Sequence, residues 1–237
     1  MKYFKVLLML IWTTSIGYSQ TNQGESINQN IEQLGDAGSA NAVRLFDNRY
    51  EGVRGTPFHS EDWEKANIKT RDGVKENIKS KLNLEQYQIY GLMDNDQVSQ
   101  LNRDVIQYIE FGSGRIFVNT STLDDWDGET VFLELLSKGK NGALYALRSK
   151  VLKKADFKGS YSSGTQYDEY KSKTQYFFES SNSKIFKIKT KTRDIASLLD
   201  LDEKLLKKFM KKESIGNVKN EQELTKLFRN YNNGLIN

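Results

Sequence analysis

The alternation of apolar and polar residues between positions 50 and 192 constrains the fold more than any other feature of this sequence. Successive side chains of a β-strand point to opposite faces, so a period of two residues predicts strands with one buried face. The segment 105–111 (VIQYIEF) shows this pattern most clearly. About nine segments are predicted to be strands: 66–70, 74–84, 87–90, 105–111, 115–118, 131–138, 143–151, 174–179 and 185–189.

Short turn signals join these segments. The dipeptides Asp72-Gly73 and Asn141-Gly142 supply the positive φ angles of tight β-hairpins. Strands joined by such short turns pair antiparallel, and a sheet of this size usually curls or closes. The sequence therefore predicts an α+β, β-rich fold with an antiparallel meander of about nine strands, arranged as a curled sheet or a partly open barrel.

Residues 194–237 carry a helical pattern instead, with apolar residues three or four positions apart. Asp194 is expected to cap a short first turn, and Asp200 and Asn220 each stand three residues before a glutamate, as in a capping box. Gly216 is expected to end the lysine-rich helix. We predict two to three C-terminal helices whose apolar stripe packs on the sheet. The alternative is that the lysine-rich helix lies on an anionic surface or an acidic partner.

Residues 1–19 have the three-part pattern of a secretory signal peptide. Lys2 and Lys5 precede an apolar run at 6–12, and Gly17 and Ser19 are small residues placed as at a cleavage site. The apolar run is shorter than the ~20 residues of a membrane-spanning helix. We therefore expect an exported protein of the periplasm or the extracellular space, with no transmembrane span in the mature chain.

The remaining chain divides by composition into three parts. Residues 20–48 are polar and are expected to form a loosely ordered leader. A short helix within it is suggested by three apolar residues at helical spacing: Ile27, Ile31 and Leu34. Residues 49–193 are predicted to form the antiparallel β domain, and residues 194–237 the helical region packed on it. The chain has no cysteine, so disulfides do not stabilise it.

The charge of the chain is unevenly distributed. The formal net charge is +4, and removing the charges of Lys2 and Lys5 leaves +2. A nearly neutral mature chain argues against a dedicated nucleic-acid-binding protein. Between residues 184 and 229, however, thirteen Lys and Arg stand against seven Asp and Glu, a local net charge of +6. The C-terminal region is therefore locally basic.

The single histidine limits the chemistry that the chain supports. With no cysteine present, His59 cannot belong to a multi-histidine or cysteine metal centre. We predict that His59 lies in a turn between aromatic residues without a catalytic role. One hypothesis stays open: an enzyme that uses carboxylates and hydroxyls, with Asp124, Asp125, Asp127 or His59 near a cleft.

The acidic run that follows Leu123 resembles part of a calcium-binding loop. If Gly128 were the sixth position of an EF-hand loop, then Asp125, Asp127 and Glu134 would fall at positions three, five and twelve. Leu123 would then hold the first position, where its side chain cannot bind calcium. We therefore interpret the run as a solvated turn, and predict no metal, cofactor or catalytic residue in the chain.

Three functions are compatible with these features. The leading hypothesis is a non-enzymatic envelope or secreted protein that binds a partner through a sheet face or through a tyrosine-rich segment. That segment, 157–173, is expected to be a mobile surface loop with Tyr161, Tyr167 and Tyr170. The alternatives are a carrier that holds a small apolar ligand inside a curled sheet, and a hydrolase that uses carboxylates. The pattern assigns neither the partner nor the oligomeric state.

Several short motifs, taken in their order, are similar to those of a widespread group of uncharacterised exported proteins from Bacteroidota-type bacteria. The motifs are Tyr50-x-Gly52-x-x-Gly55-Thr56-Pro57, Trp63, Asp72-Gly73, Lys81-Leu82-Asn83-Leu84, Glu110-Phe111, Phe132-Leu133-Glu134-Leu135-Leu136, Gly139-Lys140 and the helical ending at 221–232. This resemblance covers residues 50 to 232. It implies export and a β-rich body, and it implies no particular activity.

Overall fold

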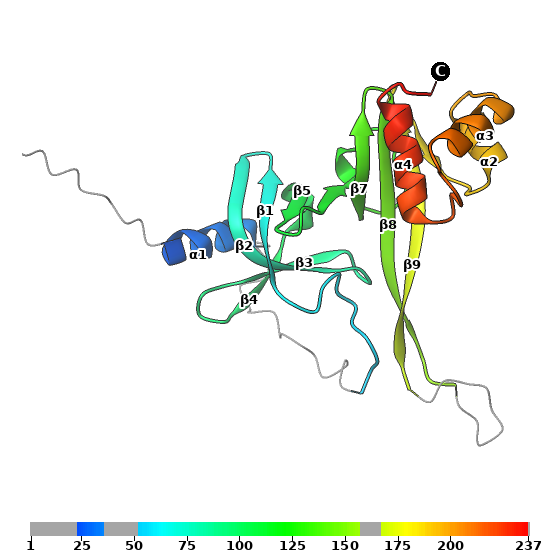
Figure 1. The fold of residues 1–237 in the computed structure, drawn as a ribbon. Helices are drawn as coiled ribbons and strands as arrows, with labels where there is room; N and C mark the ends of the chain where they lie inside the picture. Colours follow the sequence, from blue (N-terminus) through cyan, green and yellow to red (C-terminus); the bar gives the residue numbers. More distant parts are fainter. Residues whose placement is uncertain (1–22, 36–51, 157–166, 237) are drawn as a thin grey trace, which may run out of the picture.

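The computed structural model describes residues 23–35, 52–156 and 167–236. Within these ranges ten strands form one antiparallel sheet in the order β10-β9-β8-β7-β6-β5-β1-β2-β3-β4, and three of the four α-helices are C-terminal (Figure 1). The strands are β1 (Glu64–Thr70), β2 (Gly73–Asn83), β3 (Gln88–Leu92), β4 (Val98–Leu101), β5 (Ile106–Phe111), β6 (Ile116–Asn119), β7 (Phe132–Gly139), β8 (Gly142–Lys153), β9 (Glu169–Ser180) and β10 (Ile185–Lys187). The helices are α1 (Gln23–Leu34), α2 (Thr192–Leu198), α3 (Glu203–Lys212) and α4 (Glu221–Asn232). The α+β, β-rich class is confirmed, and the sheet stays open instead of closing into a barrel.

The predicted hairpins form where the turn dipeptides stand. Gly73 pairs with Thr70 at the β1–β2 turn, and Gly142 pairs with Gly139 at the β7–β8 turn. Gly142 has a φ of +146°, and a Cβ atom there would lie 2.1 Å from the carbonyl oxygen of Glu179. Only glycine fits this position, because the β9 backbone passes directly beside it.

The order of the sheet differs from a simple meander at one point. β5 pairs with β1, whereas β4 becomes an edge strand. The end of α1 occupies part of that edge, since Gly35 bridges Leu101 and the amide of Asn102 donates to the Leu34 carbonyl oxygen at 2.7 Å. The chain then returns through a 3-10 turn, η2 (Arg103–Val105), to the other side of β1.

Helix α1 lies in the region expected to be a loosely ordered leader, 20–48. Its side chains Ile31 and Leu34 are fully buried in a core with β1–β6. The helical spacing therefore marks a helix that packs on the sheet, at least over the described part of this region. The predicted signal peptide, 1–19, lies outside the described residues. Among the described helices, none combines the length and the apolar character needed to cross a membrane.

The C-terminal helices cover one face of the sheet. Leu144 of β8 and Phe178 of β9 pack with the apolar stripes of α2, α3 and α4. Their sequence neighbours Tyr145 and Phe177 point to the opposite face, where they pack with Leu133 and Trp126. Beyond this core, β8 and β9 continue as a long two-stranded arm (Figure 1).

The helix ends agree with the predicted caps at one of three positions. Asn220 caps α4 as expected, and its side chain accepts hydrogen bonds from the amides of Gln222 and Glu223. Asp202, not Asp200, caps α3. Asp200 has a φ of +53° and ends α2, where the Leu201 amide donates to the Ala196 carbonyl oxygen.

The other two boundary predictions also need correction. Ser214, with a φ of +52°, takes the left-handed position that ends α3, two residues before the predicted Gly216. The amide of Ile215 donates to the Met210 carbonyl oxygen there, which completes a Schellman motif. Asp194 lies inside the first turn of α2 and does not cap it.

Candidate functional site

The most concentrated polar cluster of the sheet is built around Arg148 on β8. Its Nε donates to Glu134 Oε2 at 2.6 Å, and its two terminal nitrogens form a bidentate pair with Glu221 at 2.6 and 2.7 Å. One terminal nitrogen also donates to Thr174 Oγ1 at 3.3 Å. Tyr176 donates its hydroxyl hydrogen to Glu221 Oε2 at 2.9 Å. Four of the five N–H groups of Arg148 are therefore bonded within the protein.

Strand register explains why these residues meet. Glu134 is paired with Ala146 across β7 and β8, so Arg148, two residues farther along β8, is its diagonal neighbour on the same face. Thr174 lies directly opposite Arg148 on β9. Glu221 is the first residue of α4, where a carboxylate also interacts favourably with the positive end of the helix.

Arg115 extends the cluster towards the N-terminal half of the sheet. It precedes β6, and its Nε lies 3.4 Å from Glu134 Oε1. Its terminal nitrogen Nη1 lies 3.4 Å from His59 Nε2. A guanidinium group only donates hydrogen bonds, so this contact assigns the lone pair to Nε2 and the proton to Nδ1 of His59.

His59 is held in place by both backbone and ring contacts. Its amide donates to the Leu82 carbonyl oxygen at 2.8 Å, and its ring packs on Phe117 with a centroid distance of 4.8 Å. The turn between aromatic residues is thus as predicted, but the side chain also faces a pocket. Burial of the ring, with a further contribution from Arg115, lowers the pKa of His59 from its usual 6.5.

The pocket beside His59 has a volume of about 270 Å³ and is open to solvent. It lies where the N-terminal half of the sheet meets the start of the β8–β9 arm and the N-terminus of α4. The residues that line it are His59, Leu84, Arg115, Arg148, Ser149, Lys150, Ser172, Lys173, Thr174 and Glu221. We call it the His59 pocket.

The electrostatics of the His59 pocket favour an anion. Its lining includes Arg115, Arg148, Lys150 and Lys173, of which Lys173 alternates with Thr174 on β9 and so points to the other face of the sheet. Two nearby carboxylates, Glu134 and Glu221, are bonded to Arg148, and Glu64 lies close enough to His59 to act on its charge. The hydrogen bonds from Arg148 lower the pKa of Glu221, so this carboxylate stays ionised and paired. Burial opposes the charged form of Arg148, but its bonds to Glu221 and Glu134 outweigh that effect and raise its pKa. Burial and the bond to Glu221 raise the pKa of Tyr176 to about 12.

The aspartates considered as catalytic residues do not lie in the same pocket as His59. Asp124, Asp125 and Asp127 lie before β7, and none of them lines the His59 pocket. Asp125 instead accepts a hydrogen bond from the Ile185 amide at 3.0 Å, on the outward side of the edge strand β10. A charged group that covers an edge amide in this way protects the sheet from pairing with other strands.

The EF-hand hypothesis also fails at its twelfth position. Glu134 is 5% exposed and is bonded to Arg148 and Arg115, so it is not free to bind calcium. Among the described residues, no three His, Cys, Asp or Glu side chains gather in a metal-binding arrangement.

The tyrosine-rich segment is partly incorporated into the fold. Tyr170 belongs to β9, is buried, and donates its hydroxyl hydrogen to Glu85 at 3.0 Å. Tyr167 stacks under the guanidinium group of Arg54 at 3.9 Å. Tyr161 lies outside the described residues. The prediction that Tyr170 lies in an exposed binding loop is therefore wrong.

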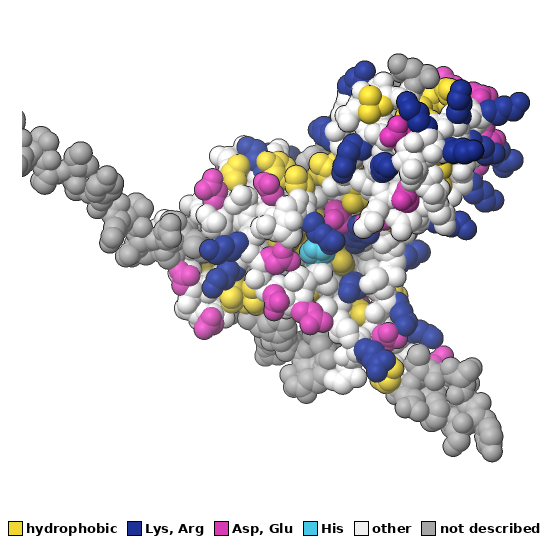
Figure 2. Space-filling model, in the orientation of Figure 1, with side chains coloured by type: hydrophobic (Ala, Val, Ile, Leu, Met, Phe, Trp, Pro, Cys, Tyr) yellow, Lys and Arg dark blue, Asp and Glu magenta, His cyan; other side chains and the backbone are white. Residues whose placement is uncertain are grey.

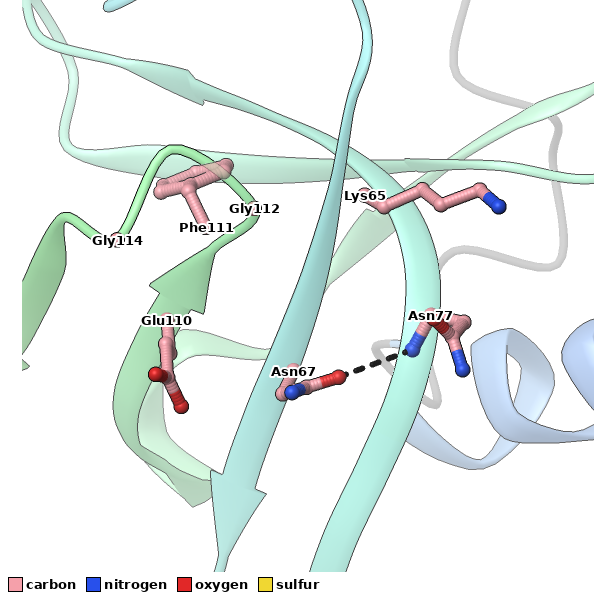
Figure 3. A pocket seen from close by; sticks show the side chains of 7 residues that line it. All are labelled: Lys65, Asn67, Asn77, Glu110, Phe111, Gly112 and Gly114. Carbon is pink, nitrogen blue, oxygen red and sulfur yellow. Dashed lines mark hydrogen bonds between the residues drawn. The ribbon is translucent and has the colours of Figure 1, made fainter.

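A second open pocket, of about 220 Å³, lies between β1, β2 and β5. Asn67 Oδ1 accepts a hydrogen bond from the Asn77 amide at 3.2 Å, at an irregularity in the β1–β2 pairing (Figure 3). Asn77 has a φ of +59°, so this contact supports a β-bulge. Lys65 and Glu110 extend to opposite sides of the pocket (Figure 3). Its charged groups do not converge, which makes the His59 pocket the better candidate site.

No protein-family model, curated protein or solved structure matches this chain.

The lowered pKa of His59 predicts how stability depends on pH. Below pH 6.5 the unfolded chain binds a proton at this residue more readily than the folded chain does. The free energy of unfolding should therefore fall as the pH decreases from 6.5 towards the folded-state pKa, and this contribution should be fully present above 6.5. Urea unfolding at several pH values between 5 and 8 measures it.

The matched control for this prediction is His59→Gln, which removes the titrating group. Its free energy of unfolding should change less than that of the wild type over the same pH range. Equal slopes for the two proteins would mean that the folded and unfolded states bind the proton at His59 equally well.

Proposed function

We propose that the chain is an exported, non-enzymatic binding protein and that the His59 pocket holds an anionic group of its partner. The observation that carries the proposal is the imbalance of charge in the pocket. Arg115 and Lys150 line it on the face of Arg148, while the carboxylates Glu134 and Glu221 are already paired with Arg148. Because four of the five N–H groups of Arg148 are engaged, its role is to hold the pocket together. Lys150, together with the N–H groups of Arg115 that do not face Glu134 or His59, would meet a ligand.

The chemistry of the pocket suits a carboxylate or a phosphate group. Ser172 and Thr174 place hydroxyl groups beside the cations, and hydroxyls and cations both donate hydrogen bonds to such an anion. His59 is neutral at pH 7 because its pKa is lowered. An anion near Arg115 would favour the protonated ring, so binding of the anion and protonation of His59 should support each other.

The alternative functions have less support. A hydrolase that uses carboxylates needs one of them free to act as acid or base, whereas Glu134 and Glu221 are both held in ion pairs with Arg148. A carrier of an apolar ligand needs an enclosed apolar cavity. The His59 pocket and the pocket between β1, β2 and β5 are both open and lined by polar side chains.

Affinity capture from an envelope extract tests the proposal, with the exported form of the chain as bait. The wild type should retain the same components in repeated experiments, and the variant Lys150→Gln should lose most of them. The control variant Lys79→Gln removes the same charge from β2 and should retain them. If both variants retain the same components as the wild type, the pocket is not the binding site.

A further inference from the structure

The second basic feature of the molecule is the C-terminal helical region, which is separate from the His59 pocket. All thirteen Lys and Arg side chains between residues 184 and 229 are exposed. Only two of the seven Asp and Glu side chains in this range, Asp200 and Asp202, are exposed, and the other five are half-buried. Lys and Arg side chains gather over these helices (Figure 2). The surface is therefore more positive than the net charge of the segment suggests.

Five of the seven carboxylates of this region make contacts within the fold. Asp202 caps α3, and Glu223 accepts a hydrogen bond from the Gly216 amide at 3.0 Å. Glu221 is paired with Arg148, and Asp194 lies near Arg193 at 3.9 Å. Glu203 pairs with Lys207 at 2.6 Å along α3. Two of these five carboxylates bind backbone amides and three lie beside cations, so most of the exposed charge of the region is positive.

Helix α3 concentrates the positive charge on one face. The lysine face of α3 consists of Lys204, Lys207, Lys208, Lys211 and Lys212, which are all exposed. At 100° per residue these five positions fall within less than half of the helix circumference. The opposite face carries Leu206 and Met210, which are buried against the neighbouring helices and the sheet. The lysine face is thus held in a fixed orientation by the packing of α3.

We propose that the lysine face of α3 docks the protein on a membrane surface that contains anionic phospholipids. Lysines near such a surface gain energy from the negative surface potential without specific geometry. Lysine is a compact point charge, whereas arginine is favoured where phosphates are recognised through paired hydrogen bonds. Of the thirteen cations between residues 184 and 229, eleven are lysines, which favours a diffuse anionic surface over specific phosphate recognition.

A lipid surface also fits better than a nucleic acid. Proteins that bind single-stranded nucleic acids place aromatic side chains between their cations so that bases stack on them. Between residues 184 and 229, Phe186 is the one aromatic side chain in the exposed class, and it lies on β10 away from α3 in the sequence. The lysine face itself has no aromatic residue.

Co-sedimentation with lipid vesicles tests this inference, using protein purified after export. The wild type should bind vesicles of phosphatidylglycerol and phosphatidylcholine, should not bind vesicles of phosphatidylcholine alone, and should be released by salt. The variant Lys204→Gln/Lys208→Gln/Lys211→Gln keeps the Glu203–Lys207 pair. Since each lysine near an anionic surface contributes roughly 1 kcal/mol, its partition coefficient should fall on the order of 100-fold.

The control variant Lys65→Gln/Arg71→Gln/Lys79→Gln removes the same charge from the N-terminal half of the sheet and should bind vesicles nearly as the wild type does. Equal losses in both triple variants would mean that net charge, and not the lysine face, drives binding. Tighter binding to single-stranded DNA than to vesicles at the same ionic strength would also overturn the inference. Circular dichroism of each variant checks that the fold is retained.

Discussion

Replacing Arg148 with methionine is expected to lower the free energy of unfolding by about 3–5 kcal/mol, the range for breaking one side of a buried ion pair. The change would leave Glu134, whose side chain is 6% exposed, without its closest cation. It would also remove the bidentate partner of Glu221, at the point where α4 meets the sheet. Methionine keeps much of the side-chain volume, so the loss measures the polar network more than a cavity.

Two further variants make this prediction specific. In Arg148→Met/Glu134→Leu the buried carboxylate is also removed, and a large part of the lost stability should return. Arg115→Met should cost less than about 1 kcal/mol, because the Arg115 side chain is 50% exposed. Urea denaturation measures all three. If Arg148→Met costs no more than Arg115→Met, the cluster does not join α4 to the sheet as we describe.

Replacing Phe228 with alanine is expected to cost about 3–5 kcal/mol, the usual range for a large aromatic side chain in a core. Phe228 is fully buried, and its ring lies 5.1 Å from the ring of Phe178 on β9. Because α4 holds Glu221 at the His59 pocket, this packing also fixes the position of the candidate site. Thermal or urea unfolding with a circular dichroism signal measures the loss.

Phe209→Ala is the control for this prediction. Phe209 belongs to the apolar stripe of α3 but is only half-buried, so its truncation should cost clearly less. If Phe228→Ala left the midpoint of unfolding unchanged, the C-terminal helices would not be docked on the sheet. If the two substitutions cost the same, the two side chains would be equally buried, contrary to the structure.

The sheet was predictable mainly where alternation and turn chemistry agree. The Asp72-Gly73 and Asn141-Gly142 hairpins form as expected, because their strands are long and their turns require glycine. Strand β4 was missed because it has four residues, of which only Val98 and Leu101 are buried. The helix caps were misplaced because Asp200 and Asp202 are both good candidates, and only tertiary packing decides which of them takes the left-handed conformation.

The candidate site was much harder to predict. His59 stood out as the single histidine, but the sequence did not indicate that Arg115, Arg148 and Glu221 lie beside it. One signal was available: Glu134 interrupts an apolar strand, and a buried carboxylate needs a partner. The partner is Arg148, fourteen positions later, and it becomes apparent only when the β7–β8 register is known.

The most direct test of the proposed anion site uses the single histidine of the chain as a probe. The pKa of His59 is measured by NMR in sodium sulfate and in sodium chloride at equal ionic strength, since sulfate keeps its charge across the titration. A sulfate ion in the pocket should raise the pKa of His59 in the wild type, and should do so much less in Lys150→Gln. The same pKa in both salts for the wild type would contradict an anion-binding pocket beside His59.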